Sequence, residues 1–496
     1  MAVKVDTQKE IIFGSSDPNI SRVISKKKKD GELRKLAPRI YTTNLIDSPA
    51  NIVRRNLIEI LAYRYPNALI SHRSAKEMRP TSTGDFFLTN STTRRVTDLP
   101  GIILNFVKGP KATAHDIPFM GMHISGEHRY MLENMQLSRK SGDESRVLPI
   151  SVIENKLEQL LLTGGEERLN QYRDELREVA NELGMADEFS KINNIISALL
   201  STHDARVLST DSAKARASGN PFDANRVGLF EILFDTIKDR YFVIRNNRNT
   251  DEDSFRLFSF FESYFSNYIE GTEFDIEEAK EIVDSGIPMP RRDEDSHDIL
   301  GTFKILSNRT EMRRVPTSPE ELFAILSHRH TILLEGRPHM NPGVFKMRNN
   351  RAGQTEFVDY QLVKGTLSQG FKYYSALTDP FARAIFMMFM IGEVHPFNDG
   401  NGRIARVMMN AEFVRADQSR IIVPTVFRED YILALRKLTR HKDPMAYINV
   451  MTKLHQFSDN LYGTDFTELK NYLAACNAYE EPSQAKLQII DRSIRH

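Results

Sequence analysis

The sequence predicts an α+β protein of several domains, with a mainly α-helical domain in its second half. At 496 residues the chain is longer than one hydrophobic core usually supports, so about two to four domains are expected. Apolar residues make up 40% and charged residues 27%, which is typical of folded globular proteins. Apolar residues recur with strand-like spacing in residues 85–107 and mainly with helical spacing after residue 152.

Four segments are predicted along the chain. Residues 1–80 are expected to form a small module, residues 81–215 a mixed strand and helix unit, residues 216–460 the helical domain, and residues 461–496 a C-terminal tail. The boundary before the helical domain rests on residues 209–225, which are small and polar and therefore typical of a linker.

The N-terminal module carries an excess of positive charge. Its first 60 residues contain twelve Lys and Arg against seven Asp and Glu, although the whole chain has a formal net charge of only +1. Asp17-Pro18 predicts the start of a helix that ends with Lys26 to Lys29, and Asp30-Gly31 predicts a tight hairpin after it. Helix, basic run and hairpin are the order of a winged helix-turn-helix, whose second helix enters the DNA major groove. DNA binding through residues 1–60 is therefore one expectation, and a solvated charged face is the alternative.

This module also resembles the N-terminal region of AbiEi-type antitoxin regulators. The resemblance rests on Glu32-Leu33-Arg34-Lys35-Leu36, on Arg39-Ile40-Tyr41 and on Ile70-Ser71-His72-Arg73-Ser74-Ala75. It implies a winged-helix regulator at this end of the chain.

Cysteine usage and hydropathy predict a cytoplasmic protein without a membrane partner. Cys476 is the only cysteine, which excludes an intrachain disulfide and a zinc site built on several thiolates. Residues Met1 to Lys9 lack the apolar stretch of a signal peptide. The most apolar stretch, Ala384 to Val394, is shorter than the roughly 20 residues that cross a bilayer, so a buried helix is expected there.

The clearest chemistry lies in one segment, His395-Pro396-Phe397-Asn398-Asp399-Gly400-Asn401-Gly402-Arg403-Ile404-Ala405-Arg406. Before it, Asp379-Pro380 predicts a helix start, and apolar residues follow at core spacing. After it, Val407 to Val414 resumes a helical pattern. The segment is therefore predicted to be a glycine-rich turn between two helices.

The residue types in this turn suit a polyphosphate. Gly400 and Gly402 let the backbone approach a ligand closely, and N–H groups at a helix N-terminus attract an anion. Arg403 and Arg406 lie one turn apart and can share the phosphates, while the residue before Gly400, Asp399, can hold Mg²⁺. At the start of the turn His395 can accept a proton from an attacking hydroxyl. The alternative is a purely structural connection between two helices, with a core histidine, salt-bridged arginines and a capping Asp.

The segment matches the signature His-Pro-Phe-x-Asp/Glu-Gly-Asn-Gly-Arg-x-x-Arg at every defining position, and so it resembles the Fic family, most of whose members transfer AMP. The resemblance implies a mainly helical Fic fold from about Arg226 to Asp459, with ATP as substrate and Mg²⁺ as cofactor. It implies that His395 is the base, that Asp399 binds Mg²⁺ between the α- and β-phosphates, and that Arg406 faces the γ-phosphate. The phosphate cradle that it implies consists of Gly400, Asn401, Gly402 and Arg403.

Two more segments resemble parts of the same family. Residues Asn341 to Phe345, followed by Thr355 to Val358, look like its β-hairpin flap, which binds the main chain of a target as an added strand. Residues 254–270 are predicted to form an aromatic helix whose end, Ser266-x-x-x-Glu270-Gly271, is similar to the inhibitory motif of Fic proteins. The resemblance implies that Ser266 and Glu270 are regulatory, and that Glu270 pairs with Arg406 so that ATP binds unproductively. The alternative is an ordinary polar helix end with a glycine stop.

Three histidines lie close together in the sequence, His328, His330 and His339, but they are not predicted to form a metal site. No ligand-like Asp, Glu or Cys accompanies them at helical spacing. Exposed or internally hydrogen-bonded side chains are expected instead of a metal site.

Taken together, the sequence predicts a protein adenylyltransferase that transfers AMP from ATP to a Ser, Thr or Tyr hydroxyl of a protein, with this chain itself as one candidate target. One alternative is phosphotransfer, or transfer from another nucleotide, by the same residues. Another is a DNA-binding, antitoxin-like regulator whose Fic domain is silent or modifies only itself. The assembly state, with a homo-oligomer among the candidates, stays open.

Overall fold

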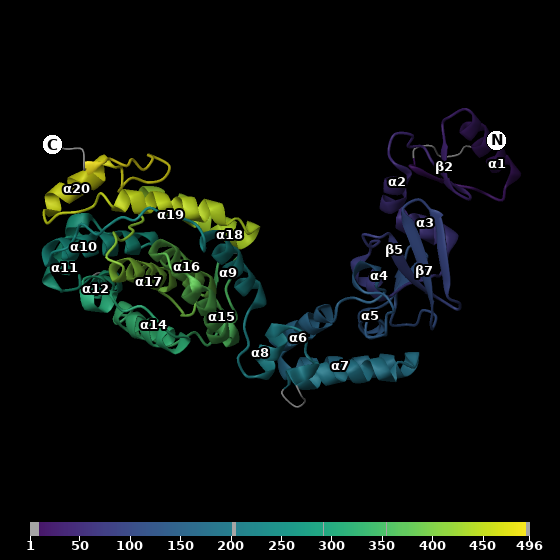
Figure 1. Ribbon diagram of the computed structural model, residues 1–496, viewed down its shortest axis with the longest axis horizontal. Helices are drawn as coiled ribbons and strands as arrows, with labels where there is room; N and C mark the ends of the chain where they lie inside the picture. Colours follow the sequence, from purple (N-terminus) through teal and green to yellow (C-terminus); the bar gives the residue numbers. More distant parts are fainter. Residues whose placement is uncertain (1–8, 201–204, 291, 354, 493–496) are drawn as a thin grey trace. The chain divides into compact units, whose positions relative to one another are not determined.

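The computed structural model describes residues 9–200, 205–290, 292–353 and 355–492. The chain forms two compact units, Met1–Ser218 and Gly219–His496 (Figure 1). The first unit mixes β-sheets with helices, and the second is mainly helical, so the described protein is mostly α-helical with an N-terminal mixed α/β region.

The first unit contains two sheets. A three-stranded sheet has the order β1-β3-β2, and a six-stranded mixed sheet has the order β6-β7-β5-β4-β9-β8, in which β5 and β7 pair in parallel, as do β4 and β9. The elements of this unit are β1 (Ile11–Phe13), α1 (Pro18–Lys29), β2 (Arg34–Ala37), β3 (Ile40–Thr42), α2 (Pro49–Arg55), α3 (Leu57–Arg64), β4 (Leu69–Ile70), α4 (His72–Glu77), β5 (Asp85–Asn90), β6 (Arg94–Leu99), β7 (Ile102–Lys108), β8 (Ile117–Phe119), β9 (Met122–Ile124), α5 (Glu127–Glu133), η1 (Gly142–Glu144), α6 (Ile150–Leu183), α7 (Ala186–Leu199), η2 (Ala205–Val207) and α8 (Asp211–Ala217).

The predicted N-terminal helix is present as α1, but the hairpin that follows it lies elsewhere than expected. Asp17 caps α1 by accepting a hydrogen bond from the backbone of Asn19, and the four lysines occupy the last turn. Gly31, with φ of +77°, ends the helix, and the hairpin turn lies instead between β2 and β3, where Arg39 has φ of +61°. A helix followed by a hairpin is therefore present, whereas winged-helix identity and DNA binding stay predictions.

Residues on both sides of the predicted boundary at residue 80 belong to the same compact unit. Strand β4, on the N-terminal side, pairs with β5 and β9 on the C-terminal side. The core is shared as well, because Ile52 and Ile60 are buried in one cluster with Phe86 and Leu104. The sheet therefore joins residues that the sequence assigns to two segments.

The predicted linker is partly helical. Its first half contains α8, which packs on the α6 and α7 core through Ala213, and Ser212 of α8 donates a hydrogen bond to Glu158. The division between the two units falls after Ser218, inside the predicted linker range. The small, polar composition of this segment predicts a linker and did not indicate helix α8, whose buried residues are the small side chains Ser212 and Ala213.

The second unit surrounds the glycine-rich turn with helices. Its elements are α9 (Ala224–Ile237), α10 (Glu252–Ile269), α11 (Ile276–Ser285), α12 (Asp293–Leu306), α13 (Arg309–Met312), α14 (Pro319–Leu333), η3 (Pro338–Met340), β10 (Arg351–Ala352), β11 (Thr355–Glu356), η4 (Tyr360–Leu362), α15 (Val363–Ala376), α16 (Pro380–Val394), α17 (Asn401–Arg415), η5 (Thr425–Phe427), α18 (Arg428–His441), α19 (Pro444–Ser458) and α20 (Phe466–Ala475).

Helices α16 and α17 pack against each other at the centre of this unit (Figure 1). Asp379 caps α16 through the backbone N–H of Ala382, as the sequence predicts, and apolar side chains such as Ile385 and Phe389 are almost fully buried. Among the described residues, no helix has the length and hydropathy needed to cross a bilayer. The predicted C-terminal tail packs into the same unit, where Phe466 of α20 stacks on Phe261 of α10.

The two-stranded hairpin β10–β11 differs from the predicted flap in its first strand. Arg351 pairs with Glu356, and Ala352 pairs with Thr355. The segment Asn341 to Phe345 is a turn instead of a strand, because Asn341 and Gly343 have φ of +55° and +80°. The second half of the flap prediction coincides with β11.

Candidate active site

The glycine-rich turn has the predicted geometry. Helix α16 ends at Val394, and His395 adopts a left-handed backbone conformation with φ of +52°, which is uncommon for a residue other than glycine. Helix α17 begins at Asn401, after Gly400, whose φ is +70°. The first N–H groups of α17 have no acceptor within the helix, so its N-terminus can attract an anion.

Asn401 closes this turn with its side chain. Its Oδ1 atom accepts a hydrogen bond of 2.8 Å from the backbone N–H of Phe397, and its Nδ2 atom donates one of 2.8 Å to the carbonyl of the same residue. The side chain of Asn401 is therefore committed to the shape of the turn, and its backbone is the part that can contact an anion.

His395 is held as a neutral imidazole with one free nitrogen. Its Nδ1 atom lies 3.1 Å from the carbonyl oxygen of Gly392, so Nδ1–H donates this hydrogen bond and Nε2 is left as an acceptor. The ring of Phe357, directly after β11, stacks on the imidazole at 3.5 Å with an angle of 3° between the planes. The pKa of His395 is lowered to about 4, chiefly by burial, and the positive charge of Lys346 contributes to the lowering. These contacts orient the imidazole as a proton acceptor.

Arg406 is bound by the end of α10. Its Nη2 atom lies 2.6 Å from Oε1 of Glu270, and its Nε and Nη2 atoms each donate a hydrogen bond of 2.9 Å to Ser266, to the hydroxyl and the carbonyl respectively. Burial alone would raise the pKa of Glu270, but Arg406 outweighs this effect and holds the pKa below its usual value. The contact predicted between Glu270 and Arg406 is therefore present.

Glu270 also reaches the N-terminus of α17. A Cβ atom placed on Gly402 would lie 2.2 Å from Oε1 of Glu270, so only glycine leaves room for this carboxylate. The carboxylate thus lies against the first turn of the helix, where a phosphate group is predicted to bind.

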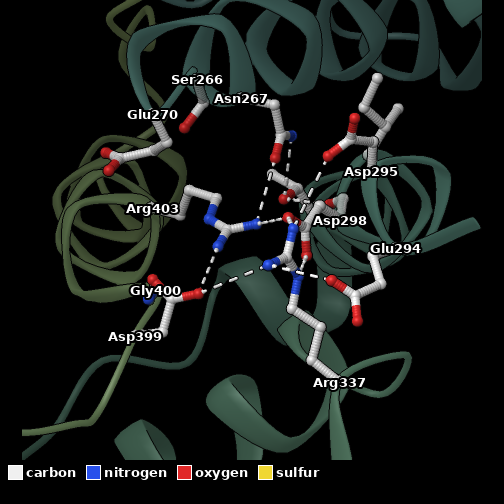
Figure 2. Close-up of polar contacts among 12 residues, drawn as sticks. Ser266, Asn267, Glu270, Glu294, Asp295, Asp298, Arg337, Asp399, Gly400 and Arg403 are labelled. Atoms are coloured by element: carbon white, nitrogen blue, oxygen red, sulfur yellow. Dashed lines mark hydrogen bonds and ion pairs between the residues drawn. The ribbon is translucent and has the colours of Figure 1, made fainter. Parts of the chain in front are cut away.

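Arg403 points in a different direction from Arg406. Its Nη1 atom lies 2.7 Å from Oδ2 of Asp298, on α12, and 3.4 Å from the side-chain oxygen of Asn267. Figure 2 shows its guanidinium facing Asp298, Asn267 and Asp399, while the carboxylate of Glu270 points away from this group. Within the described residues, no hydrogen-bond acceptor serves the buried Nε atom of Arg403.

Asp399 is partly exposed and can fit a hard cation. Its Oδ1 atom accepts a hydrogen bond of 2.7 Å from the backbone of Gly400, and its Oδ2 atom lies 3.7 Å from Arg403. Across the described residues there is no cluster of three or more His, Cys, Asp or Glu side chains that could hold a metal by itself. A cation at Asp399 would therefore need oxygens from a ligand or from water, which is how Mg²⁺ is usually bound beside phosphates.

A cavity of about 300 Å³ opens beside the turn. Its lining includes His395, Gly402, Arg406 and Glu270, together with apolar residues of α16 and α18 and the ring of Phe357. The other four predicted phosphate and metal residues, Asp399, Gly400, Asn401 and Arg403, do not line it. The cavity has the mixed apolar and polar lining that is typical of small-molecule sites.

His330, for which the sequence predicts an exposed or internally hydrogen-bonded side chain, is hydrogen-bonded to the glycine-rich turn itself. It is fully buried, its Nε2 atom lies 3.0 Å from the carbonyl of Asp399, and its Nδ1 atom accepts a hydrogen bond of 2.8 Å from the backbone of Gly343. Its ring stacks on Phe397 at 3.7 Å. Burial lowers the pKa of His330 to about 4, in agreement with a neutral ring. His330 therefore ties the glycine-rich turn to the loop before the flap, a contact that no spacing in the sequence indicates.

Comparison with known proteins gives a family for this part of the chain. Residues 318–412 match the Fic/DOC family. The chain is 30% identical over 115 residues to the protein adenylyltransferase fic-1 of Caenorhabditis elegans, a match that covers 23% of this chain and 22% of the relative. It is 24% identical over 214 residues to the protein adenylyltransferase Fic of Nematostella vectensis, covering 40% of this chain and 47% of the relative.

These matches span less than half the length of either adenylyltransferase. Among solved structures, Fic-1 (residues 134–508) of C. elegans aligns with 66% of this chain and 92% of its own, with a TM-score of 0.36 and 17% identity. The family match extends over the pre-motif helices and the whole turn from His395 to Arg406. Residues 318–412 therefore match the Fic/DOC family, and the chain is similar in part to Fic protein adenylyltransferases.

Proposed function

We propose that this chain transfers AMP from ATP to a Ser, Thr or Tyr hydroxyl of a protein, and that Glu270 restrains this activity. The observation that carries the proposal is the shared cavity: the neutral imidazole of His395 and the guanidinium of Arg406 line one cavity at the N-terminus of α17. A proton acceptor and a phosphate-binding cation next to a helix N-terminus are the groups that such a transfer needs.

The reaction is an in-line displacement at the α-phosphorus. The target hydroxyl oxygen forms the new bond to the α-phosphorus, its proton passes to Nε2 of His395, and the bond from the α-phosphorus to the bridging oxygen breaks. AMP is then joined to the target, and pyrophosphate leaves. Asp399 is the residue that would hold Mg²⁺, which neutralises phosphate charge when it is bound. The backbone at Gly400 and Gly402 would contact the phosphates.

The flap offers a way to present the target. Strands β10 and β11 form a two-stranded hairpin, and within the described part of the chain no third strand pairs with it. Phe357 follows β11 directly and stacks on His395, so the hairpin is connected to the proposed base. An extended segment of a target protein that paired with the hairpin would bring its hydroxyl close to that base.

The proposal also accounts for the position of Glu270. Its carboxylate occupies the Arg406 guanidinium and the space above Gly402 at the same time. A triphosphate that used Arg406 would have to displace Glu270, because two anionic groups cannot share this site without repulsion. Low activity of the unaltered chain is therefore expected.

Labelled ATP tests the proposed reaction. The Glu270→Gly variant is incubated with Mg²⁺ and with ATP labelled at either the α- or the γ-phosphate, and protein-bound label is measured, with Glu270→Gly/His395→Ala as control. We expect label on protein from the α-position only, and none in the control. Label from the γ-position alone would show phosphotransfer instead, and absence of label from both would favour a regulator with a silent Fic domain.

The pH dependence of the reaction gives an independent check on His395. With its pKa near 4, the imidazole stays unprotonated as the pH falls from 7.5 to about 5, and it loses its function as a base only near its own pKa. We expect kcat/KM of the Glu270→Gly variant to be constant over this range at saturating Mg²⁺. If the histidine had an ordinary pKa of about 6.5, half of the activity would be lost when the pH reaches about 6.5. A fall in kcat/KM centred at about pH 6.5 would therefore contradict the lowered pKa of His395.

A further inference from the structure

A buried carboxylate outside the motif joins two guanidiniums beside the glycine-rich turn. Asp298, on α12, is almost fully buried. Its Oδ2 atom lies 2.7 Å from Nη1 of Arg403 and 2.7 Å from Nη2 of Arg337, and its Oδ1 atom accepts a hydrogen bond of 3.1 Å from Nε of Arg337. Figure 2 shows the two guanidiniums on either side of Asp298. Arg337 is therefore held next to a motif arginine although it lies 66 positions earlier in the sequence.

Arg337 also faces the predicted cation-binding residue. It lies in the loop after α14, and its Nη1 atom is 4.0 Å from Oδ2 of Asp399 and 3.5 Å from Oε2 of Glu294. Arg403 approaches the same oxygen of Asp399 at 3.7 Å. The guanidiniums of Arg337 and Arg403 thus both lie close to the partly exposed carboxylate of Asp399.

The position of Asp399 between the two guanidiniums indicates where a further anion could bind. Asp298 makes the short contacts to both guanidiniums, and Arg337 also lies 3.5 Å from Glu294 and 3.7 Å from Asp295. These carboxylates hold Arg337 in place, while its Nη1 atom and Arg403 both approach the partly exposed oxygen of Asp399. A phosphate group bound through a cation at Asp399 would therefore lie within reach of both guanidiniums, which bind phosphate oxygens well.

We infer that Arg337 is a phosphate-binding residue outside the motif, specific for nucleotides that carry a β-phosphate, and that Asp298 is the positioning residue that holds Arg337 beside Arg403. This inference rests on the proposed function, with Mg²⁺ at Asp399 placed between the α- and β-phosphates as the resemblance to the Fic family implies. ATP and ADP carry the β-phosphate, whereas AMP does not. Planar guanidiniums bind phosphate oxygens through two parallel hydrogen bonds, which a lysine cannot reproduce.

Nucleotide binding tests this inference without any transfer reaction. The full chain carrying Glu270→Gly and His395→Ala is the parent, and its affinities for ATP, ADP and AMP are measured by calorimetry in Mg²⁺. Adding Arg337→Gln is expected to weaken ATP and ADP binding by roughly 10-fold, the size of one charge-assisted contact, and AMP binding by less than about 2-fold. Adding Arg337→Lys should weaken ATP and ADP binding less than Arg337→Gln does, because the charge is retained.

A matched control is available in the same unit. Arg313 pairs with Asp417 on the surface, and Arg313→Gln should leave all three affinities unchanged. AMP affinity and the thermal unfolding midpoint show whether each variant is folded. An equal loss of affinity for all three nucleotides would assign Arg337 a purely structural role and overturn the inference, as would unchanged ATP and ADP binding.

The outcomes also separate this inference from the proposed function. A parent that binds none of the nucleotides overturns both. If the β-phosphate dependence is found but no α-label reaches protein in the transfer assay, the inference about Arg337 stands and AMP transfer fails. If AMP transfer occurs and Arg337→Gln does not distinguish ADP from AMP, only the inference fails.

Discussion

Replacement of His395 with alanine is expected to reduce AMP transfer by about 10³-fold, the central contribution of a general base. The physical reason is the position of its Nε2 atom. The Gly392 carbonyl fixes the ring through Nδ1, Phe357 fixes the ring plane, and burial keeps the ring neutral, so Nε2 is free to accept the hydroxyl proton. The rate is measured with α-labelled ATP in the Glu270→Gly background, where the restraint is removed.

Nucleotide binding should be nearly unchanged in the same variant. The imidazole serves as a proton acceptor, and phosphate binding depends on Arg406 and the N-terminus of α17. An exposed histidine at the end of α18, His441, provides the control, and His441→Ala should transfer AMP at the rate of its parent. Retention of more than about a tenth of the activity by His395→Ala would contradict the role of His395 as the base.

Replacement of Glu270 with glycine is expected to raise AMP transfer by roughly 5- to 150-fold, the range of a coupling energy between two sites. Glu270 holds Arg406 at 2.6 Å and lies over Gly402, so its removal frees both the guanidinium and the helix N-terminus for phosphate. Ser266 still holds Arg406 through two hydrogen bonds, which keeps the arginine close to its position. Initial rates of α-label incorporation measure the effect.

A neighbouring acid supplies the control for this change. Glu273 is exposed three residues later, and Glu273→Gly removes a carboxylate from the same loop without touching Arg406. It should leave the transfer rate unchanged. Since the side chain of Glu270 is about one-third exposed, solvent screens its pairing, and only a small fall in the unfolding midpoint is expected. A rate of the Glu270→Gly variant equal to that of the unaltered chain, with the fold intact, would exclude a restraining role.

The local parts of the candidate site followed from contiguous sequence. A capping Asp379, a run of apolar residues, and glycines at the turn predict a helix, a tight connection and a second helix, because each of these signals acts over a few residues. The structure has α16 and α17 at the expected places. The aromatic helix α10 and its end at Glu270 were predicted for the same reason.

Contacts between distant elements were decided by the tertiary structure alone. Asp298, Arg337 and His330 come from α12, a loop and α14, and nothing in their spacing relates them to the turn that they contact. The tertiary structure also decided where the first flap strand lies and that one sheet contains strands from both sides of residue 80. The reason is that strand pairing depends on partners elsewhere in the chain.

The sequence by itself therefore determined the mainly helical second half, the glycine-rich turn, its resemblance to the Fic family and the chemistry of its side chains. These depend on local backbone preferences and on the identity of contiguous residues. The tertiary structure decided which charges lie opposite the two motif arginines: Glu270 at Arg406, and Asp298 with Arg337 at Arg403. Ion pairs of this kind form only after the helices have packed, because packing sets the distances on which electrostatic energies depend.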